Sequence, residues 1–286
     1  MTITHPARCG VVGGGRMGAG IAHALLLAGS EVVLVERDDS AAKAARERVL
    51  RAIRASQERG HVDDSKTVEQ RLSISTDIAA LAGSALVIEA VPEEEGLKRE
   101  TLTRVAGEVA DDAVIASNTS SISLDDLADG VPHPERVIGL HFFNPVPASK
   151  LVEVVITERT GEDIQDAVED WVRAWDKTPV TVRNSPGFAS SRLGVAIGLE
   201  AVRMVEEDVA TVEDIDAAMT LGYGFPMGPL KLTDLVGVDV RLGIARYLEQ
   251  ELGERFSPPR LMVDMVERGE LGRKSGRGFY DWSSAS

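Results

Sequence analysis

Short apolar runs alternate with longer amphipathic segments through the first half of the chain. The runs are rich in β-branched residues, as is typical of buried strands. They lie at 9–12, 31–36, 85–90, 113–116 and 136–140. The segments between them favour helices over 17–28, 40–59, 94–110 and 123–128. Strands that alternate with helices in this way indicate a parallel sheet covered by helices on both faces.

The pattern changes near residue 184. Two further apolar runs, at 151–157 and 179–182, flank an expected helix at 162–176, and helical periodicity then continues to residue 269. The segment Asn184-Ser185-Pro186-Gly187 lies between the two patterns, and such a Pro-Gly break is typical of a domain boundary. The sequence therefore predicts an α/β, Rossmann-like doubly wound sheet over residues 1–184, followed by an all-α domain over residues 185–286.

A glycine-rich turn follows the first expected strand. Residues 13–18 read Gly-Gly-Gly-Arg-Met-Gly, which contains the pattern G-x-G-x-x-G. Between a strand and a helix, Gly13 permits the tight bend, Gly15 lets the backbone approach a cofactor pyrophosphate, and Gly18 lets the helix lie close to the strand. Glu36 ends the next strand, where a carboxylate binds the ribose hydroxyls of NAD and repels the extra phosphate of NADP. We therefore expect an NAD-binding domain.

Composition and charge restrict the partners of the chain. Its net charge is −15, and a uniformly acidic surface repels nucleic acid and anionic membranes. We find no secretion signal and no apolar stretch long enough for a membrane span, and the single cysteine, Cys9, suits the reducing cytoplasm. An anionic substrate would need a local basic surface. The expected helix at 40–59 offers one with Lys43, Arg46, Arg48, Arg51, Arg54 and Arg59.

Polar residues follow several of the expected strands. Oxidation of an alcohol by a nicotinamide needs a base for the hydroxyl proton, and of the five histidines only His141 directly follows an expected core strand. Glu93 and Lys98 follow the run at 85–90, and the segment 117–121 follows the run at 113–116. Because ligands of open α/β sheets bind beyond the carboxyl ends of the strands, these residues should lie at one edge of the sheet.

Glu153 is the candidate partner of this histidine. The sequence Asn-Pro-Val-Pro at 144–147 should reverse the chain, and antiparallel pairing of the two flanking runs would then bring Glu153 beside the imidazole of His141. A carboxylate in that place orients the ring and stabilises its cation. A single histidine or glutamate near an apolar strand is more often structural, so position alone leaves both interpretations open.

With these residues identified, the chain resembles the L-3-hydroxyacyl-CoA dehydrogenase family, nearest its small 3-hydroxybutyryl-CoA dehydrogenases. The resemblance extends from Gly10 to Tyr280 and rests on the segments 13–18, 116–121, 141–145, 150–154, 226–229 and 272–280. It implies a general base at His141 with Glu153 as its partner. It implies that Ser120 and Asn144 line the reacting carbon and the nicotinamide. Besides these two, the implied cofactor contacts are Gly13, Gly15, Arg16, Met17, Gly18, Glu36, Glu93, Lys98 and Lys274. The helical domain would form a homodimer and close over an acyl-CoA.

One position departs from the family pattern. The family has asparagine in Gly-Phe-x-x-Asn-Arg, whereas this chain has Ser191 at that position. A hydroxyl group is shorter than an amide and cannot donate and accept from separate atoms. The substitution therefore bears on rate and substrate choice more than on the type of reaction.

We expect reversible, NAD-dependent oxidation of (S)-3-hydroxyacyl-CoA, with 3-hydroxybutyryl-CoA as the first candidate substrate. One alternative is a related NAD-dependent dehydrogenase of a free hydroxy acid, such as gulonate or carnitine. Another is a non-catalytic NAD-binding relative. The basic helix and the segment 226–229 favour the CoA thioester. The joint presence of four residues favours catalysis: Ser120, His141, Asn144 and Glu153.

Overall fold

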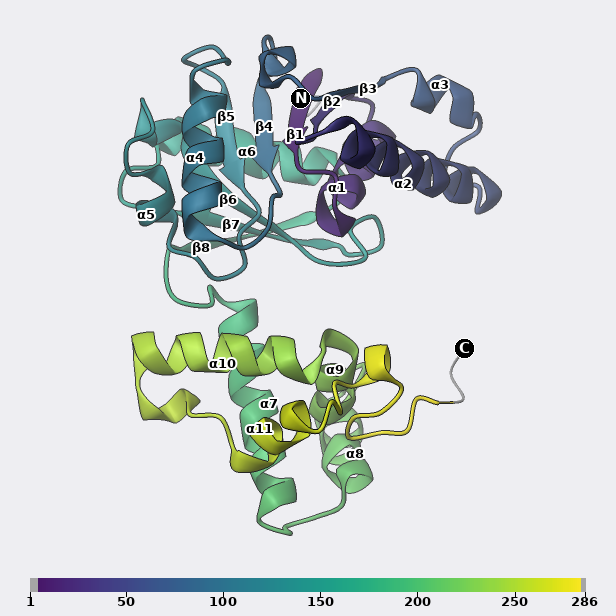
Figure 1. Ribbon diagram of the computed structural model, residues 1–286, viewed down its shortest axis with the longest axis vertical. Coiled ribbons are helices and arrows are strands. Elements are labelled where there is room, and N and C mark those ends of the chain that lie inside the picture. Colours follow the sequence, from purple (N-terminus) through teal and green to yellow (C-terminus); the bar gives the residue numbers. More distant parts are fainter. Residues whose placement is uncertain (1–4, 284–286) are drawn as a thin grey trace. The chain divides into compact units, whose positions relative to one another are not determined.

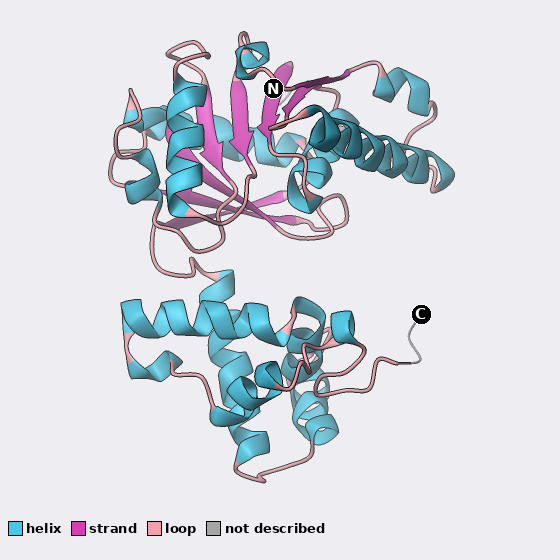
Figure 2. Ribbon diagram, in the orientation of Figure 1, coloured by secondary structure: helices cyan, strands magenta, loops and turns pink. Residues whose placement is uncertain are grey.

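The computed structural model describes residues 5–283 and divides the chain into two units, Met1–Ser185 and Pro186–Ser286. The division falls within the Pro-Gly segment at residues 184–187. Every strand of the described residues belongs to the first unit, and the second unit is built from helices and loops (Figure 2). We call them the sheet unit and the helical unit.

An eight-stranded sheet forms the centre of the sheet unit (Figure 1). Its strands follow the order β3-β2-β1-β4-β5-β6-β7-β8, and every neighbouring pair is parallel except β6 and β7. The bounds are Arg8–Val12 (β1), Glu31–Val35 (β2), Leu72–Ser75 (β3), Leu86–Glu89 (β4), Val114–Ser117 (β5), Val137–Phe142 (β6), Leu151–Ile156 (β7) and Thr178–Arg183 (β8). The predicted doubly wound α/β fold is confirmed.

Helices cover both faces of this sheet. Their bounds are Arg16–Leu27 (α1), Asp39–Glu58 (α2), Ser65–Glu69 (α3), Glu95–Ala106 (α4), Leu124–Ala128 (α5) and Glu162–Ala174 (α6). Apolar residues of α1, α2 and α6 share one buried cluster with alternate residues of the strands. In Figure 1, α4 crosses in front of the strands and α6 lies behind them.

The segment between α2 and β4 holds elements that the apolar pattern did not predict. Helix α3 spans only five residues, and β3 contributes four residues to the edge of the sheet beside β2. Leu72 is the one residue of β3 that is buried. A short edge strand with a single buried side chain leaves no apolar run in the sequence, and this explains why it was missed.

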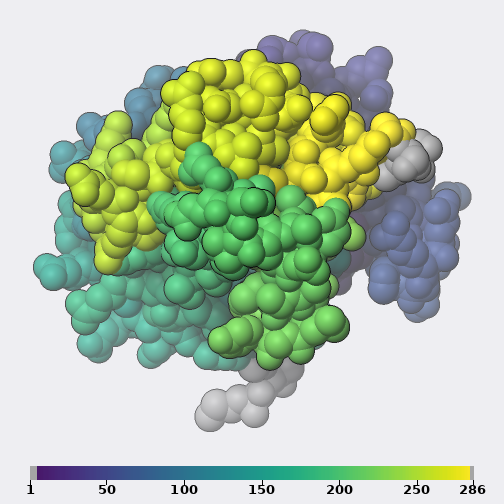
Figure 3. Space-filling model, turned by 90° about the horizontal axis from the view of Figure 1, so that it is seen from below, coloured from purple at the N-terminus to yellow at the C-terminus, as the bar shows by residue number. Residues whose placement is uncertain are grey.

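The helical unit confirms the predicted all-α domain. Its helices are Ser190–Glu206 (α7), Val212–Gly222 (α8), Pro229–Val236 (α9), Val238–Leu252 (α10) and Arg260–Glu267 (α11). Their inward faces form a separate apolar core. In the space-filling view of Figure 3, the C-terminal residues (yellow) and the region of α7 and α8 (green) form a continuous surface of this unit.

The C-terminal motif at residues 272–280 has a structural role in the helical unit. Asp234 of α9, which is buried, accepts hydrogen bonds from the amides of Phe279 and Tyr280 at 3.0 and 2.9 Å, and from the indole of Trp282 at 2.8 Å. A Cβ atom at Gly278 would overlap the same carboxylate. The glycine and the buried acid together hold the C-terminal segment against α9.

Two further observations concern the single cysteine and the possibility of a membrane-spanning helix. Cys9 lies in the core of β1 and is fully buried, and this burial raises the pKa of its thiol to about 12. No helix in the described part of the chain combines the length and the apolar character that a bilayer crossing needs.

Candidate active site

A cavity of about 350 Å³ opens where the central strands of the sheet end. The ends of β1, β4, β5 and β6 meet here because these strands are parallel neighbours. Six of the residues singled out in the sequence line it: Met17, Glu93, Lys98, Ser120, His141 and Asn144. His141 lies within β6, near its end, and the other five follow the strands β1, β4, β5 and β6.

In the glycine turn between β1 and α1, two of the motif glycines leave no room for a Cβ atom and one faces open space. Gly13 has φ of +92°, and a Cβ atom there would lie 2.8 Å from the carbonyl oxygen of Ala90. A Cβ atom at Gly18 would overlap the carbonyl oxygen of Gly13. At Gly15, in contrast, a Cβ atom would meet no atom within 4 Å. No side chain caps the start of α1 at Gly15, so its amides are available to an anion placed in that open space.

Glu36 lies beside the same turn. It directly follows β2, and its carboxylate accepts the amide of Gly14 at 2.7 Å and the amide of Arg37 at 3.1 Å. The side chain of Arg37 turns toward Asp38, with its Nε 3.1 Å from the carboxylate. The turn and the acid have the geometry that binds the pyrophosphate and ribose of a dinucleotide, and Arg37 is directed to another partner.

His141, which lines this cavity, and Glu153 form a buried pair. The expected antiparallel pairing of β6 and β7 is confirmed, and its register sets the two residues directly opposite each other. The Nδ1 atom of His141 lies 2.8 Å from Oε2 of Glu153, whose side chain is 1% exposed. Because the carboxylate accepts a hydrogen bond, Nδ1 carries the proton in the neutral ring and Nε2 is the basic nitrogen.

Neighbouring residues hold the end of β6 in place. The amide of Phe142 donates to Oδ1 of Asn118 at 2.9 Å, which ties β6 to the turn after β5. The ring of Phe143 lies against the imidazole of His141, with 4.5 Å between the ring centroids. Asn144 follows and also lines the cavity. The imidazole is therefore fixed from the side of its own strand as well as by Glu153.

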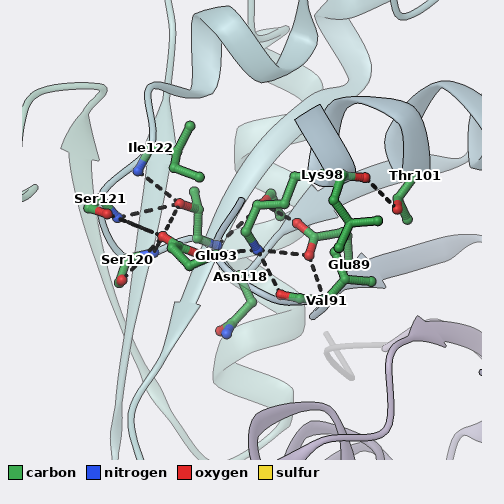
Figure 4. A network of polar contacts seen from close by, with 12 residues as sticks. Glu89, Val91, Glu93, Lys98, Thr101, Asn118, Ser120, Ser121 and Ile122 are labelled. Carbon is green, nitrogen blue, oxygen red and sulfur yellow. Dashed lines mark hydrogen bonds and ion pairs between the residues drawn. The ribbon is translucent and has the colours of Figure 1, made fainter. Parts of the chain in front are cut away.

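Glu93 organises the turn after β5 (Figure 4). Its Oε1 atom accepts from the Thr119 hydroxyl at 2.6 Å and from the Ser120 amide at 2.8 Å. The hydroxyls of Ser120 and Ser121 lie farther away, at 3.2 and 3.3 Å. One carboxylate oxygen has two lone pairs and cannot satisfy all of these donors well. The Ser120 hydroxyl is therefore weakly held and can turn toward a ligand in the cavity.

Lys98 lies between two carboxylates. Its ammonium group is 2.8 Å from Glu89 and 3.2 Å from Glu93, and it also donates to the carbonyl of Val91 at 3.3 Å. Burial alone would raise the pKa of Glu93, but the charge of Lys98 and the hydrogen bonds from Thr119 and Ser120 bring it below its usual value. Glu93 is therefore ionised at neutral pH. Lys98 lines the cavity with its ammonium already paired, so it acts on the site mainly through Glu93.

Glu89 is a buried residue of this site that was not predicted from the sequence. This residue ends β4 and is fully buried, and its carboxylate contacts Lys98, Ser117 and the amide of Val91. The available signal was a single acid within the otherwise apolar run at 85–90. An ionised side chain in such a run must be paired, because burying an unpaired charge is costly.

Two residues of interest belong to the helical unit. Lys274 forms an ion pair with Asp239, with 2.6 Å between Nζ and Oδ2. Ser191 is the second residue of α7. The expected contact of Lys274 with the cofactor and the effect of Ser191 on the substrate stay predictions.

A second and larger cavity, of about 1020 Å³, is a basic groove of the sheet unit. One wall is formed by α1 and α2, and the other by the β6–β7 connection and the end of α6. Its cationic residues are Arg48, Arg51, Arg59, Lys150 and Lys177. Only half of the expected basic residues of 40–59 line the groove, because Lys43, Arg46 and Arg54 lie elsewhere on α2. Arg54 is paired with Glu69 at 3.3 Å.

Comparison with known proteins gives matches along nearly the whole chain. The family models "3-hydroxyacyl-CoA dehydrogenase, NAD binding domain" and "3-hydroxyacyl-CoA dehydrogenase, C-terminal domain" match residues 8–185 and 187–282. A 3-hydroxybutyryl-CoA dehydrogenase of Mycobacterium tuberculosis is 42% identical over 280 residues, which cover 96% of this chain and 98% of the relative. A 3-hydroxyadipyl-CoA dehydrogenase of Escherichia coli is 39% identical over 277 residues, covering 95% of this chain and 58% of the relative. The crystal structure of (S)-3-hydroxybutyryl-CoA dehydrogenase from Ralstonia eutropha has a TM-score of 0.93 at 38% identity and covers 98% of this chain and 100% of its own.

Proposed function

This chain belongs to the 3-hydroxyacyl-CoA dehydrogenase family, and from that premise we propose how its residues perform the reaction. It is an NAD-dependent oxidoreductase that converts a 3-hydroxyacyl-CoA to the 3-oxoacyl-CoA, and the reaction is reversible. The observation that carries the proposal is the His141–Glu153 pair, with 2.8 Å between Nδ1 and Oε2, at the cavity beside the glycine turn.

NAD fits the residues of the sheet unit. The open space at Gly15 and the uncapped start of α1 would take the pyrophosphate, and Glu36 would bind the adenosine ribose. Because the carboxylate of Glu36 repels an added phosphate, NAD is preferred over NADP. Glu93, with Lys98 behind it, supports the nicotinamide end. These residues would hold NAD, which would supply a nicotinamide ring as the acceptor for the hydride of the carbinol carbon.

The side chains of the cavity accept the proton of the substrate hydroxyl and stabilise the developing carbonyl. Glu153 holds the Nδ1 proton of His141, so Nε2 takes the proton of the substrate hydroxyl, and the imidazolium that forms is stabilised by the same carboxylate. The Ser120 hydroxyl turns from Glu93 and donates to the substrate oxygen as negative charge develops there. Asn144, which follows β6, lines the position of the reacting carbon. In the reverse direction, His141 returns the proton to the new hydroxyl.

The basic groove supports a CoA thioester as the substrate. Coenzyme A carries several phosphate charges, and the groove gathers five cationic residues and one acid, Asp176, which pairs with Lys150, on a chain of net charge −15. Leu27 and Trp175 add apolar surface for the uncharged parts of coenzyme A. We propose short acyl chains as substrates, with 3-hydroxybutyryl-CoA first among them, because two of the matched relatives are named 3-hydroxybutyryl-CoA dehydrogenases.

Apolar side chains on the helical unit support a homodimer formed through that unit. Leu221 and Tyr223, at the end of α8, are 86% and 78% exposed. Several neighbours in sequence are also exposed: Phe225, Leu232, Leu235 and Val236. Exposed apolar residues grouped in this way mark association surfaces.

The cytoplasm is the proposed compartment, since the only cysteine is buried and the sequence offers no disulfide.

Steady-state oxidation of NADH tests this function directly. We expect turnover with acetoacetyl-CoA, a dependence on acyl length when longer 3-oxoacyl-CoA thioesters are compared, and weak activity with NADPH. Free keto acids related to gulonate and carnitine are the matched control, because they carry the reacting group without the CoA phosphates. Turnover of the free acids in preference to the thioester would reject the CoA assignment, and no turnover of either would reject catalysis.

A further inference from the structure

Glu89 is a fully buried acid that the proposed reaction does not use. Its carboxylate accepts three hydrogen bonds, from the Val91 amide at 2.7 Å, the Lys98 ammonium at 2.8 Å and the Ser117 hydroxyl at 2.6 Å. The pair of Glu89 and Lys98 is electrically neutral and nearly closed to solvent, since Lys98 is 1% exposed. A buried pair of this kind adds little net stability compared with apolar residues, so its position beside the cavity invites a functional explanation.

One chain of contacts leads from Glu89 to the turn after β5 through Ser117. The Ser117 hydroxyl donates a hydrogen bond to Glu89, so its lone pairs are directed away and accept the Thr119 amide at 3.2 Å. The Thr119 hydroxyl in turn accepts the amide of Ile122 at 2.9 Å. The backbone on both sides of Ser120 is therefore held by contacts that begin at Glu89.

A second chain of contacts leads to the same turn through Lys98. The ammonium of Lys98 is shared between Glu89 and Glu93, at 2.8 and 3.2 Å, and Glu93 then accepts the amide of Ser120 at 2.8 Å (Figure 4). Without the charge of Glu89, the buried ammonium would depend on Glu93 alone and draw that carboxylate toward itself. Glu93 would then move away from the turn that holds Ser120.

We propose that Glu89 is a positioning residue for Ser120. It acts through Ser117 on the amide of Thr119, and through Lys98 with Glu93 on the amide of Ser120, so both routes hold the backbone beside the Ser120 hydroxyl. The inference rests on the proposed function, in which this hydroxyl donates to the substrate oxygen. That hydrogen bond strengthens as charge develops, so a displaced Ser120 lowers kcat more than it raises the KM of the thioester.

A double-mutant cycle with Ser120 tests this role. Glu89→Gln keeps the size of the side chain and removes its charge, and we expect kcat with acetoacetyl-CoA to fall about tenfold, as misplacement of a reacting group implies. In a Ser120→Ala background the same change should alter kcat less than about twofold, because the group that Glu89 positions is gone. An equal loss of kcat in both backgrounds would overturn the proposal, as would an unchanged kcat in Glu89→Gln.

Amide hydrogen exchange of the protein without cofactor gives a second readout. Glu89→Gln should speed exchange in residues 119–122, whose amides are bonded to Ser117, Glu93 and Thr119. Glu169→Gln is the matched control. Its carboxylate is also hydrogen-bonded, to Thr181, but it lies on α6 and should leave exchange at 119–122 as in the wild type. Equal exchange of this segment in Glu89→Gln and wild type would contradict the proposal.

Ser117→Ala covers the case in which Glu89→Gln does not fold. This change removes one of the two routes and leaves the buried ion pair intact, and we expect kcat to fall about threefold through the same misplacement. The loss should again vanish in the Ser120→Ala background, and a loss that persists there would overturn the proposal. If the wild type fails to turn over acetoacetyl-CoA, the proposed function is wrong, while the exchange experiment still decides whether Glu89 orders the turn.

Discussion

His141 owes its orientation to a residue on the neighbouring strand. The carboxylate of Glu153 is almost completely buried, and its Oε2 atom lies 2.8 Å from Nδ1 of His141. In a buried site, a carboxylate that accepts this proton fixes the tautomer and favours the imidazolium that forms during oxidation. Glu153 therefore orients the imidazole ring and stabilises its protonated form.

We expect His141→Ala to lower kcat at least about a hundredfold, the usual contribution of a general base. Glu153→Gln should retain the hydrogen-bonding shape but lose the charge, so its kcat should lie between those of His141→Ala and the wild type. Steady-state assays with acetoacetyl-CoA measure both. His133→Ala is the control, because His133 contacts Glu135 at the surface, away from the cavity. Near-wild-type turnover of His141→Ala would remove the histidine from the mechanism.

Single residues differ in how far the sequence predicts them. His141 could be chosen because it directly follows an expected core strand, and Glu153 because a Pro-containing turn predicts an antiparallel return. The partners of Lys98 could not, since Glu89 lies nine residues before it and meets it only when β4 and α4 pack together. Catalytic and binding roles of these residues stay predictions, whereas the side-chain pairs themselves are structural facts.

At the scale of elements, the turn between β1 and α1 combines two requirements in six residues. Gly13 and Gly18 allow the helix to start against its own strand, since a Cβ atom at either would meet backbone atoms. Gly15 has no such neighbour, so the fold does not require a glycine there, and we expect the open space beside it to hold a ligand. The same G-x-G-x-x-G motif therefore contains positions with distinct mutational consequences.

Gly15→Ala and Gly18→Ala separate these consequences. Gly15→Ala should melt close to the wild type and bind NADH at least about tenfold more weakly, because the methyl group fills the place of the pyrophosphate. Gly18→Ala should lower the free energy of unfolding by about 2 kcal/mol, the scale of overpacking. Thermal melting and fluorescence titration with NADH measure the two effects. Loss of stability in Gly15→Ala without loss of affinity would contradict the assignment of the open space.

Elements with strong periodicity were predicted, and weakly patterned ones were not. The core strands are apolar on both faces, so β1, β2, β4, β5 and β6 were all visible in the sequence. The edge strand β3 has one buried residue and gave no signal. For α2, the cluster of positive charge was visible, but which cations line the groove depends on how the helix packs against α1 and was not predictable from spacing alone.

At the scale of the whole molecule, charge is distributed unevenly. The chain has 46 acidic and 31 basic residues, yet five cations line one groove. An acidic protein with one basic groove directs a polyanion to that groove and repels it elsewhere, which raises the rate of productive encounter. Binding of a CoA thioester should accordingly weaken as ionic strength rises.

The exposed apolar residues at the end of α8 bear on the oligomeric state. We expect a dimer in sedimentation experiments, and Leu221→Asp combined with Tyr223→Asp should shift it to monomers, because a charge cannot be buried unpaired at an apolar interface. Val180→Asp is the control, since it places the same charge at an exposed apolar residue of the sheet unit. A wild-type monomer, or a dimer that persists in the double variant, would reject association through this surface.

The seclusion of Cys9 makes the protein a convenient frame for thiol-directed probes. The only sulfhydryl of the chain is inside β1 and its pKa of about 12 keeps it protonated in neutral buffer, so maleimides and other alkylating dyes have no native target. A cysteine introduced at any surface site would be labelled alone, without first preparing a cysteine-free background. Fluorophores and spin labels can thus be attached at chosen positions, one per chain, to follow ligand binding optically or magnetically.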